Sequence, residues 1–146
     1  MSEYDKGIED YEAINQEYID LFAEDLKKKG LKQSTIDRHI FNVDLYLNDF
    51  LPREGLSMEE GNGSISYFMK YFYIAKCSWS VPSNIKSTAV SIRKFYKLMV
   101  DMGKADREGY EYMVDEIKNE TDSWIETCRR YNDPFDEDPF DEGDWW

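Results

Sequence analysis

The feature that most constrains the fold is an amphipathic stretch in the second half of the chain, residues 81–103. Apolar residues recur there at intervals of three or four, the spacing that places side chains on one face of an α-helix. They are Ile85, Ala89, Ile92, Phe95, Tyr96 and Met99. Pro82 and Ser83 suit a helix start, and Gly103 suits a helix end. We therefore predict one helix whose apolar face packs on a folded core.

The opposite face of this predicted helix is cationic. Lys86, Arg93 and Lys97 are separated by seven and four residues and form one stripe, with Lys94 beside it. Such a stripe can contact phosphates. A row of cations is more often simply a solvated helix face, and on this stretch alone we favour that interpretation.

Charge is distributed unevenly along the chain. The 146 residues carry a formal net charge of -13, whereas residues 26–104 carry +6, residues 1–25 carry -8 and residues 105–146 carry -11. A net charge this negative argues against a generic nucleic-acid binder. The basic centre between two acidic arms still allows a local binding surface for an anion.

Helical spacing of apolar residues continues through most of the remaining chain. It predicts further helices at about residues 4–29, 31–51 and 65–76, and no stretch alternates as a β-strand does. The first turns of the earliest helix are very acidic and contain Gly7, so we expect a break or frayed start before Asn15. The sequence thus predicts an all-α fold.

Cap and turn residues mark the expected helix ends. Gly30 should end the first helix, and Pro52 with Gly55 should end the second. Ser34 and Ser64 are expected to cap the second and third helices through their hydroxyl groups.

A heptad-like pattern follows this central region. Apolar positions succeed one another at steps of four and three. They are Tyr110, Val114, Ile117, Thr121, Trp124, Cys128 and Tyr131. The pattern fits a fifth helix packed on the bundle, or a seam for a partner helix. Because Thr121 and Cys128 weaken such a seam, we favour packing within the chain.

The last residues form an acidic and aromatic tail. The sequence Asp-Pro-Phe-Asp-Glu occurs twice, starting at Asp133 and at Asp138. Its prolines block a helix and its acids repel one another, so we predict disorder. Its aromatic side chains suit docking into a basic, apolar groove, although a solubilising tail is the alternative. The candidate partner-binding residues are Phe135, Phe140, Trp145 and Trp146.

Four segments together resemble a known domain. In order, they are EYIDLFAEDLKKKGL, GLKQSTIDRHIFNVDLYLNDFL, SISYFMKYFYIAK and SNIKSTAVSIRKFYKLMVDMGKA. They resemble the four helices of the core-binding domain at the N-terminal side of tyrosine recombinases and phage integrases. The resemblance rests on hydrophobic spacing over roughly residues 16–105. Residues at expected places are Gly30, Ser34, Thr35, Phe95, Tyr96 and Gly103.

The resemblance implies a compact SAM-like four-helix bundle that clamps duplex DNA with its second and fourth helices. Carried over to this chain, it nominates as DNA-binding residues Lys32, Arg38, Lys86, Arg93, Lys94 and Lys97. A physical argument supports these residue types independently. Lys and Arg gain affinity by releasing counterions from the phosphate backbone, which needs no base-specific geometry.

The recombination chemistry of that family has no counterpart here. It requires a separate domain with a tyrosine nucleophile, arginines and a His-x-x-Arg motif, but the single histidine, His39, is followed by Ile-Phe-Asn. Cys77 and Cys128 lie too far apart for a metal-ligand motif. We expect no enzymatic activity, no cofactor and no metal. We interpret His39 as a partly buried or surface residue.

We divide the chain into an acidic arm (1–15), a core-binding-like domain (16–104), a C-terminal helix (105–131) and the tail (132–146). The predicted function is a non-catalytic DNA-binding module, an accessory or regulator of a mobile element. The alternative is an acidic protein-interaction or DNA-mimic inhibitor in counter-defence. Because neither a signal peptide nor a spanning apolar run is evident, we expect a cytoplasmic protein with reduced thiols and no membrane contact. The oligomeric state stays open.

Overall fold

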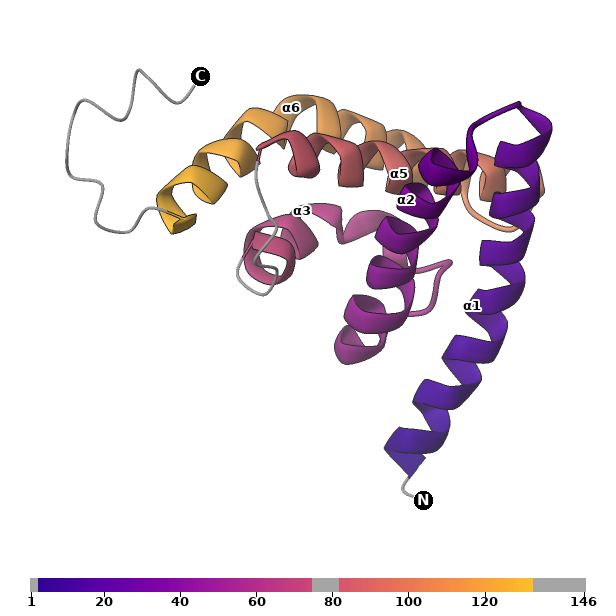
Figure 1. Cartoon of the computed structure of the whole chain (residues 1–146). Coiled ribbons are helices and arrows are strands. Elements are labelled where there is room, and N and C mark those ends of the chain that lie inside the picture. Colours follow the sequence, from indigo (N-terminus) through magenta and orange to yellow (C-terminus); the bar gives the residue numbers. More distant parts are fainter. Residues whose placement is uncertain (1–2, 75–81, 133–146) are drawn as a thin grey trace.

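A computed structural model of the chain describes residues 3–74 and 82–132 (Figure 1). The α-helices are α1 (Glu3–Lys28), α2 (Gln33–Asp44), α3 (Ile65–Tyr67), α5 (Pro82–Asp101) and α6 (Arg107–Asn132). No β-strand occurs within these two described stretches. The predicted all-α class is confirmed there, whereas the specifically SAM-like arrangement stays a prediction.

Short π- and 3-10 segments extend two of these helices. A π-helix, η1 (Leu45–Phe50), continues α2, and a 3-10 turn, η2 (Leu51–Glu54), follows it. A second π-helix, η4 (Phe68–Tyr73), continues α3, which is preceded by the 3-10 turn η3 (Gly61–Gly63). The second and third predicted helices therefore exist, with broader π-helical turns over part of their length.

Glycines end three helical segments, as predicted. Gly30, Gly55 and Gly103 have φ values of 83°, 69° and 71°, which only glycine adopts at little cost. At the end of α1 the Leu31 amide donates to the Leu26 carbonyl at 3.2 Å, and the other two ends have equivalent bonds. These bonds satisfy carbonyl groups that the helix itself leaves without donors.

Of the two alternatives predicted before Asn15, the break is wrong, whereas the frayed start stays a prediction. Helix α1 runs without interruption from Glu3 to Lys28. Asn15 is buried, and its side-chain amide donates to the Leu47 carbonyl at 3.0 Å and to Asn48 Oδ1 at 2.8 Å. These bonds fasten the middle of α1 to η1. A tertiary contact therefore supports the helix where local charge repulsion predicted a break.

The expected serine caps are not formed. Helix α2 begins at Gln33 with Lys32 at the N-cap position, so Ser34 already lies inside the helix. Ser64 does occupy the N-cap position of α3, but its hydroxyl makes no capping hydrogen bond. Neither helix start therefore depends on a serine side chain.

Helix α6 packs against its own chain, as we favoured. It lies along α5 and also contacts α3 (Figure 1). Trp124 is completely buried, and its Nε1 donates to Ser66 Oγ at 3.3 Å. Met113 and Ile125, which the heptad pattern does not include, are buried as well. The seam predicted from spacing is therefore close to the buried face but rotated from it.

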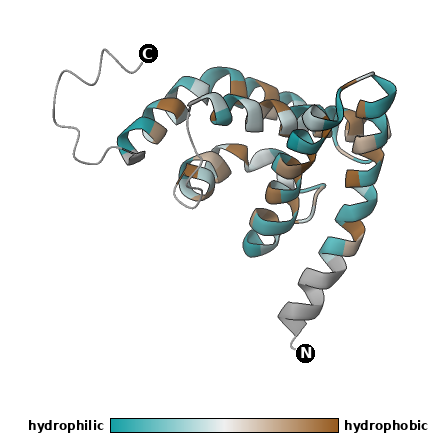
Figure 2. Ribbon diagram, viewed as in Figure 1, coloured by the Kyte–Doolittle hydropathy of each residue, from teal (hydrophilic) through white to brown (hydrophobic). Residues whose placement is uncertain are grey.

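One apolar core connects all of these helices. Figure 2 shows apolar residues recurring along each helix between hydrophilic ones. The core takes Phe22 from α1, Val43 from α2, Ile65 from α3, Phe95 from α5 and Trp124 from α6. The core therefore runs across the sequence boundary that we placed between residues 104 and 105. It also holds the outer face of α5 in a defined orientation.

Candidate nucleic-acid interface

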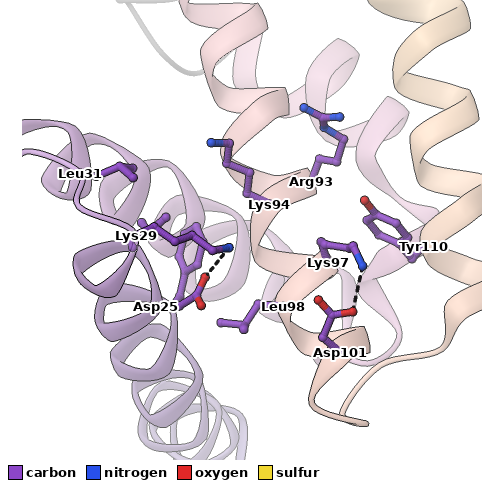
Figure 3. A pocket seen from close by; sticks show the side chains of 11 residues that line it. Asp25, Lys29, Leu31, Arg93, Lys94, Lys97, Leu98, Asp101 and Tyr110 are labelled. Atoms are coloured by element: carbon purple, nitrogen blue, oxygen red, sulfur yellow. Dashed lines mark hydrogen bonds and ion pairs between the residues drawn. The ribbon is translucent and has the colours of Figure 1, made fainter.

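A cleft of about 510 Å³ lies between the end of α1 and the outer face of α5, and it reaches the start of α6 (Figure 3). Four cations line it. Lys29 directly follows the last residue of α1, and Arg93, Lys94 and Lys97 belong to α5. Two carboxylates, Asp25 and Asp101, line it as well. The cleft therefore carries a local excess of positive charge on a very acidic protein.

The burial of the opposite side of α5 explains why these cations face outward. Ile85, Ile92 and Phe95 are at most 1% exposed, so the helix has only one orientation that covers them. Lys86, Lys94 and Lys97 are consequently exposed, and Arg93 is half-buried. The apolar periodicity of this helix thus determines where its cationic stripe points.

Two of the four cations in the cleft are paired with carboxylates. Lys29 Nζ lies 2.9 Å from Asp25 Oδ2, and Lys97 Nζ lies 2.9 Å from Asp101 Oδ1. The hydrogen bond from Lys97 lowers the pKa of Asp101 below its ordinary value, and the positive charges of Lys97, Arg107 and Lys29 act in the same direction. Both pairs are solvent-accessible, so a competing anion can displace them at little cost.

Arg93 and Lys94 have no such partner within the described part of the chain. Figure 3 shows both side chains projecting from α5 with their charged ends away from Asp25 and Asp101. A guanidinium group can contact two phosphate oxygens at once, whereas an ammonium group acts as a point charge. These two residues are therefore the strongest candidates for binding an external anion.

The floor of the cleft is apolar. Phe22 and Leu26 are buried beneath it, while Leu31, Leu98 and Tyr110 are half-buried along it. The turn at Gly30 brings Leu31 back beside the end of α1. An apolar floor below cationic side chains favours a ligand that carries both negative charge and apolar groups.

A buried polar network fastens α2 to α5 beside the cleft. His39 Nδ1 lies 2.7 Å from Ser91 Oγ, and the Asn42 side-chain amide donates to the same oxygen at 2.9 Å. Burial lowers the pKa of His39 below 6.5, and the charges of Lys94 and Arg38 lower it further. His39 is 8% exposed, which makes it more buried than we expected and gives it a packing role.

The structure separates the six predicted DNA-binding residues into groups. Arg93, Lys94 and Lys97 line the cleft, and Lys86 continues their stripe toward the start of α5. Lys32 is exposed at the N-cap of α2. Arg38 lines a second, smaller pocket of about 180 Å³. Four of the six predicted residues therefore lie on α5, whereas Lys32 and Arg38 lie on or beside α2. Neither of these two cavities is lined by all six.

Sequence reasoning missed Lys29 and Leu31 as parts of the site. Lys29 belongs to a run of three lysines that suits the end of a helix. The signal that could have found both residues is Gly30, because a left-handed turn at that position reverses the chain beside them. The predicted partner-binding residues, which are Phe135, Phe140, Trp145 and Trp146, lie outside the residues that the structure describes. Cys77 also lies outside them.

Two further properties concern the residues that the structure describes. No group of three or more His, Cys, Asp or Glu side chains among them is arranged to hold a metal ion. No helix among them is long and apolar enough to cross a bilayer. Comparisons of the chain with protein families, with curated proteins and with solved structures found no match.

Proposed function

We propose that this chain is a non-catalytic DNA-binding module, related to the core-binding domain of tyrosine recombinases and folded as a SAM-like bundle with an added helix. It contacts the phosphate backbone of duplex DNA through the cationic face of α5. The observation that supports the proposal most strongly is the pair Arg93 and Lys94, which line an open cleft without a carboxylate partner within the described residues. An accessory or regulatory role in a mobile element fits a module without its own chemistry.

The dimensions of the cationic stripe suit a duplex. Lys86 and Lys97 are eleven positions apart on one helix, which corresponds to about 16 Å along its axis. That length matches the rise of about five base pairs of B-form DNA. Because the segments on either side of the basic centre carry -8 and -11, repulsion should orient the duplex toward α5 and confine binding to low ionic strength.

The test measures binding of a fluorescently labelled duplex by anisotropy over a range of salt concentrations. Each cation that contacts a phosphate contributes about 0.9 to the slope of log K against log salt concentration. Arg93→Gln and Lys94→Gln should each reduce the slope by about one and weaken binding to all sequences similarly. Lys118→Gln removes an exposed lysine from α6 and serves as the matched control.

The proposal is wrong if no duplex binds at low salt, either to the wild-type chain or to a variant in which Phe135, Phe140, Trp145 and Trp146 are replaced by serine. It is also wrong if Lys118→Gln weakens binding as much as Lys94→Gln does. Equal losses would indicate that only net charge matters, with no contribution from the face of α5.

One observation favours the alternative, a DNA mimic. Helix α6 exposes Glu108, Glu111, Asp115 and Asp122, while its Met113, Trp124 and Cys128 are buried in the core. Such a row of carboxylates can occupy a basic DNA-binding groove of another protein. This function predicts that the chain competes with duplex for a basic DNA-binding protein. It also predicts that neutralising these four acids abolishes the competition.

A further inference from the structure

We propose that the cleft between α1 and α5 is the docking site of the chain's own C-terminal segment, residues 133–146. Docking there covers the cations that the proposed function assigns to DNA, so the segment regulates the same site. The regulatory consequence rests on the proposed function, whereas the docking contact itself does not.

The cleft combines two features that few ligands satisfy together. Arg93 and Lys94 supply positive charge that no carboxylate of the described residues pairs with. Leu31, Leu98 and Tyr110 leave apolar surface partly exposed beside them. A phosphate backbone satisfies the charge but not the apolar floor. A peptide that alternates acids with large apolar residues satisfies both.

Residues 133–146 have this composition. The repeat Asp-Pro-Phe-Asp-Glu places one aromatic residue between acids in each copy, and Trp145 and Trp146 end the segment. The other acidic stretches of the chain are different. The acids of α6, for example, lie on a helix whose Met113, Trp124 and Cys128 are already buried in the core. The tail combines seven acids with four aromatic residues within fourteen positions.

The segment is long enough to return to the cleft. Helix α6 ends at Asn132, and Tyr110 near its start lines the cleft, so the distance along the helix is about 33 Å. The fourteen residues that follow Asn132 span at most about 46–50 Å when extended. Counted from Asn132, Phe140 reaches at most about 26–29 Å and Trp145 at most about 43–47 Å. The two terminal tryptophans therefore reach the end of the cleft at Tyr110, whereas the two repeats lie along the path to it.

Tethering makes such a contact effective even if it is weak. A segment on a short linker acts at an effective concentration in the millimolar range. Non-specific protein–DNA complexes typically dissociate at about 10⁻⁴ to 10⁻⁶ M. The tethered segment therefore competes with DNA without having to bind tightly.

The test uses NMR spectra of the full chain, so that no truncation is needed. A tail variant replaces the four aromatic residues: Phe135→Ser, Phe140→Ser, Trp145→Ser and Trp146→Ser. We expect the amide signals of residues 25–31 and 93–98 to shift between this variant and the wild-type chain. The signals of Glu17, Asp20 and Glu24, which line a separate acidic surface of α1, should stay unchanged.

A second variant tests the same contact from the other side. Arg93→Glu combined with Lys94→Glu should shift the signals of residues 133–146 toward those of an isolated peptide of that sequence. Lys118→Glu, the matched control on α6, should leave them unchanged. In duplex-binding measurements at low salt, the tail variant should bind about tenfold or more tightly than the wild-type chain.

The outcomes separate this proposal from the proposed function. If the cleft signals are the same in the tail variant and the wild-type chain, docking is wrong. Shifts that vary with protein concentration also overturn it, because the occupant is then the tail of a second copy. If the cleft signals shift at every concentration but neither protein binds duplex, docking stands and the DNA-binding function fails.

Discussion

At the scale of single residues, the contact between α2 and α5 depends on polar groups inside the core. His39, Asn42 and Ser91 are all buried, and their hydrogen bonds compensate for the loss of water. Thr88 differs from them, since its buried Oγ1 has no hydrogen-bond partner among the residues that the structure describes. A protonated His39 would add a charge to this network beside Lys94 and Arg38. The stability of the contact should therefore depend on pH.

We predict that His39 makes the protein less stable below about pH 6.5. Its pKa is lower in the folded chain than its ordinary value of 6.5, so the unfolded chain binds a proton first as the pH falls. The free energy of unfolding should therefore decrease as the pH is lowered from about 6.5. Above about pH 6.5 His39 is neutral in both states, so it should not make stability depend on pH there.

The measurement is urea denaturation at about pH 7.5 and about pH 5.5 for the wild-type chain and for His39→Asn. The asparagine can still reach Ser91 but does not titrate, so the variant should lose less stability between the two pH values. Asp49 and Glu116 have raised pKa values and change stability in the opposite direction, but they contribute equally to both proteins. Identical pH dependence would show that His39 has no such role.

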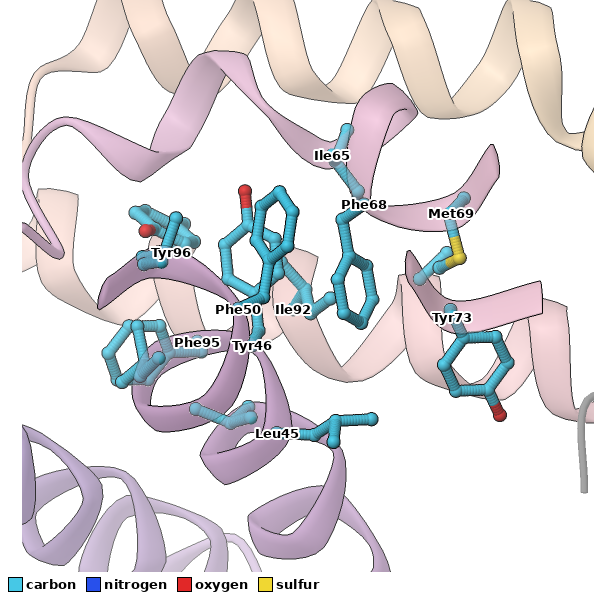
Figure 4. Close-up of a cluster of buried hydrophobic side chains, with 14 of the residues drawn as sticks. Leu45, Tyr46, Phe50, Ile65, Phe68, Met69, Tyr73, Ile92, Phe95 and Tyr96 are labelled. Atoms are coloured by element: carbon cyan, nitrogen blue, oxygen red, sulfur yellow. The ribbon is translucent and has the colours of Figure 1, made fainter. Parts of the chain in front are cut away.

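At the scale of elements, two tyrosines hold the connection between η2 and α3. Tyr96 of α5 donates its hydroxyl to the Met58 carbonyl at 2.7 Å, and Tyr46 of η1 donates to the Gly61 carbonyl. Figure 4 shows both rings within the aromatic cluster that includes Phe50 and Phe68. Burial raises the pKa of both tyrosines, so their hydroxyl groups keep their protons and remain donors.

The close approach of these elements also explains why position 61 is occupied by glycine. A Cβ atom at position 61 would lie 2.5 Å from the Tyr96 hydroxyl oxygen and 2.6 Å from Leu51 Cδ1. No larger residue fits there without movement of the aromatic core. The connection between the two helical segments is therefore specified by packing.

We expect Tyr96→Phe to lower the free energy of unfolding by about 0.5–1.5 kcal/mol, because the Met58 carbonyl loses one of its two donors and keeps the Gly61 amide. Tyr71→Phe is the matched control. Tyr71 is 64% exposed, so the loss of its hydroxyl group should change the free energy of unfolding by less than about 0.5 kcal/mol. Urea denaturation followed by far-UV circular dichroism measures both. A Tyr96→Phe variant as stable as the control would contradict the role of the hydroxyl.

At the scale of the whole molecule, the chain has one apolar core to which α6 contributes. Trp124 and Met113 are fully buried among residues of the earlier helices. Ser66 near the start of α3 accepts a hydrogen bond from Trp124, and its amide donates to Glu116 Oε1 at 3.1 Å. Helix α6 should therefore unfold together with the rest of the core.

Trp124→Ala should lower the free energy of unfolding by about 3–5 kcal/mol, since it leaves a large cavity in the core. Tyr112→Ala, at a position that is 58% exposed on the same helix, should change it by less than about 0.5 kcal/mol. The wild-type chain should show coincident transitions by circular dichroism and tryptophan fluorescence. Two separate transitions would mean that α6 folds independently.

Much of the secondary structure follows from local sequence. Helix α5 lies where its apolar spacing predicts it, and Gly30, Gly55 and Gly103 end helical segments. These features are local because a helix hydrogen-bonds residues four apart, and because a left-handed residue at its end is nearly always glycine. The direction of the α5 cations follows from the same periodicity.

Only the tertiary structure decided which residues meet across helices. Asn15 stabilises the middle of α1 because η1 lies beside it, and Lys29 joins Arg93 and Lys94 because α1 ends beside α5. The heptad pattern of α6 likewise missed the buried Met113, because the register between two helices depends on how their side chains interlock. Local periodicity determines which face of a helix is apolar. The packing of the whole core determines which neighbour covers that face and which charges remain at its edge.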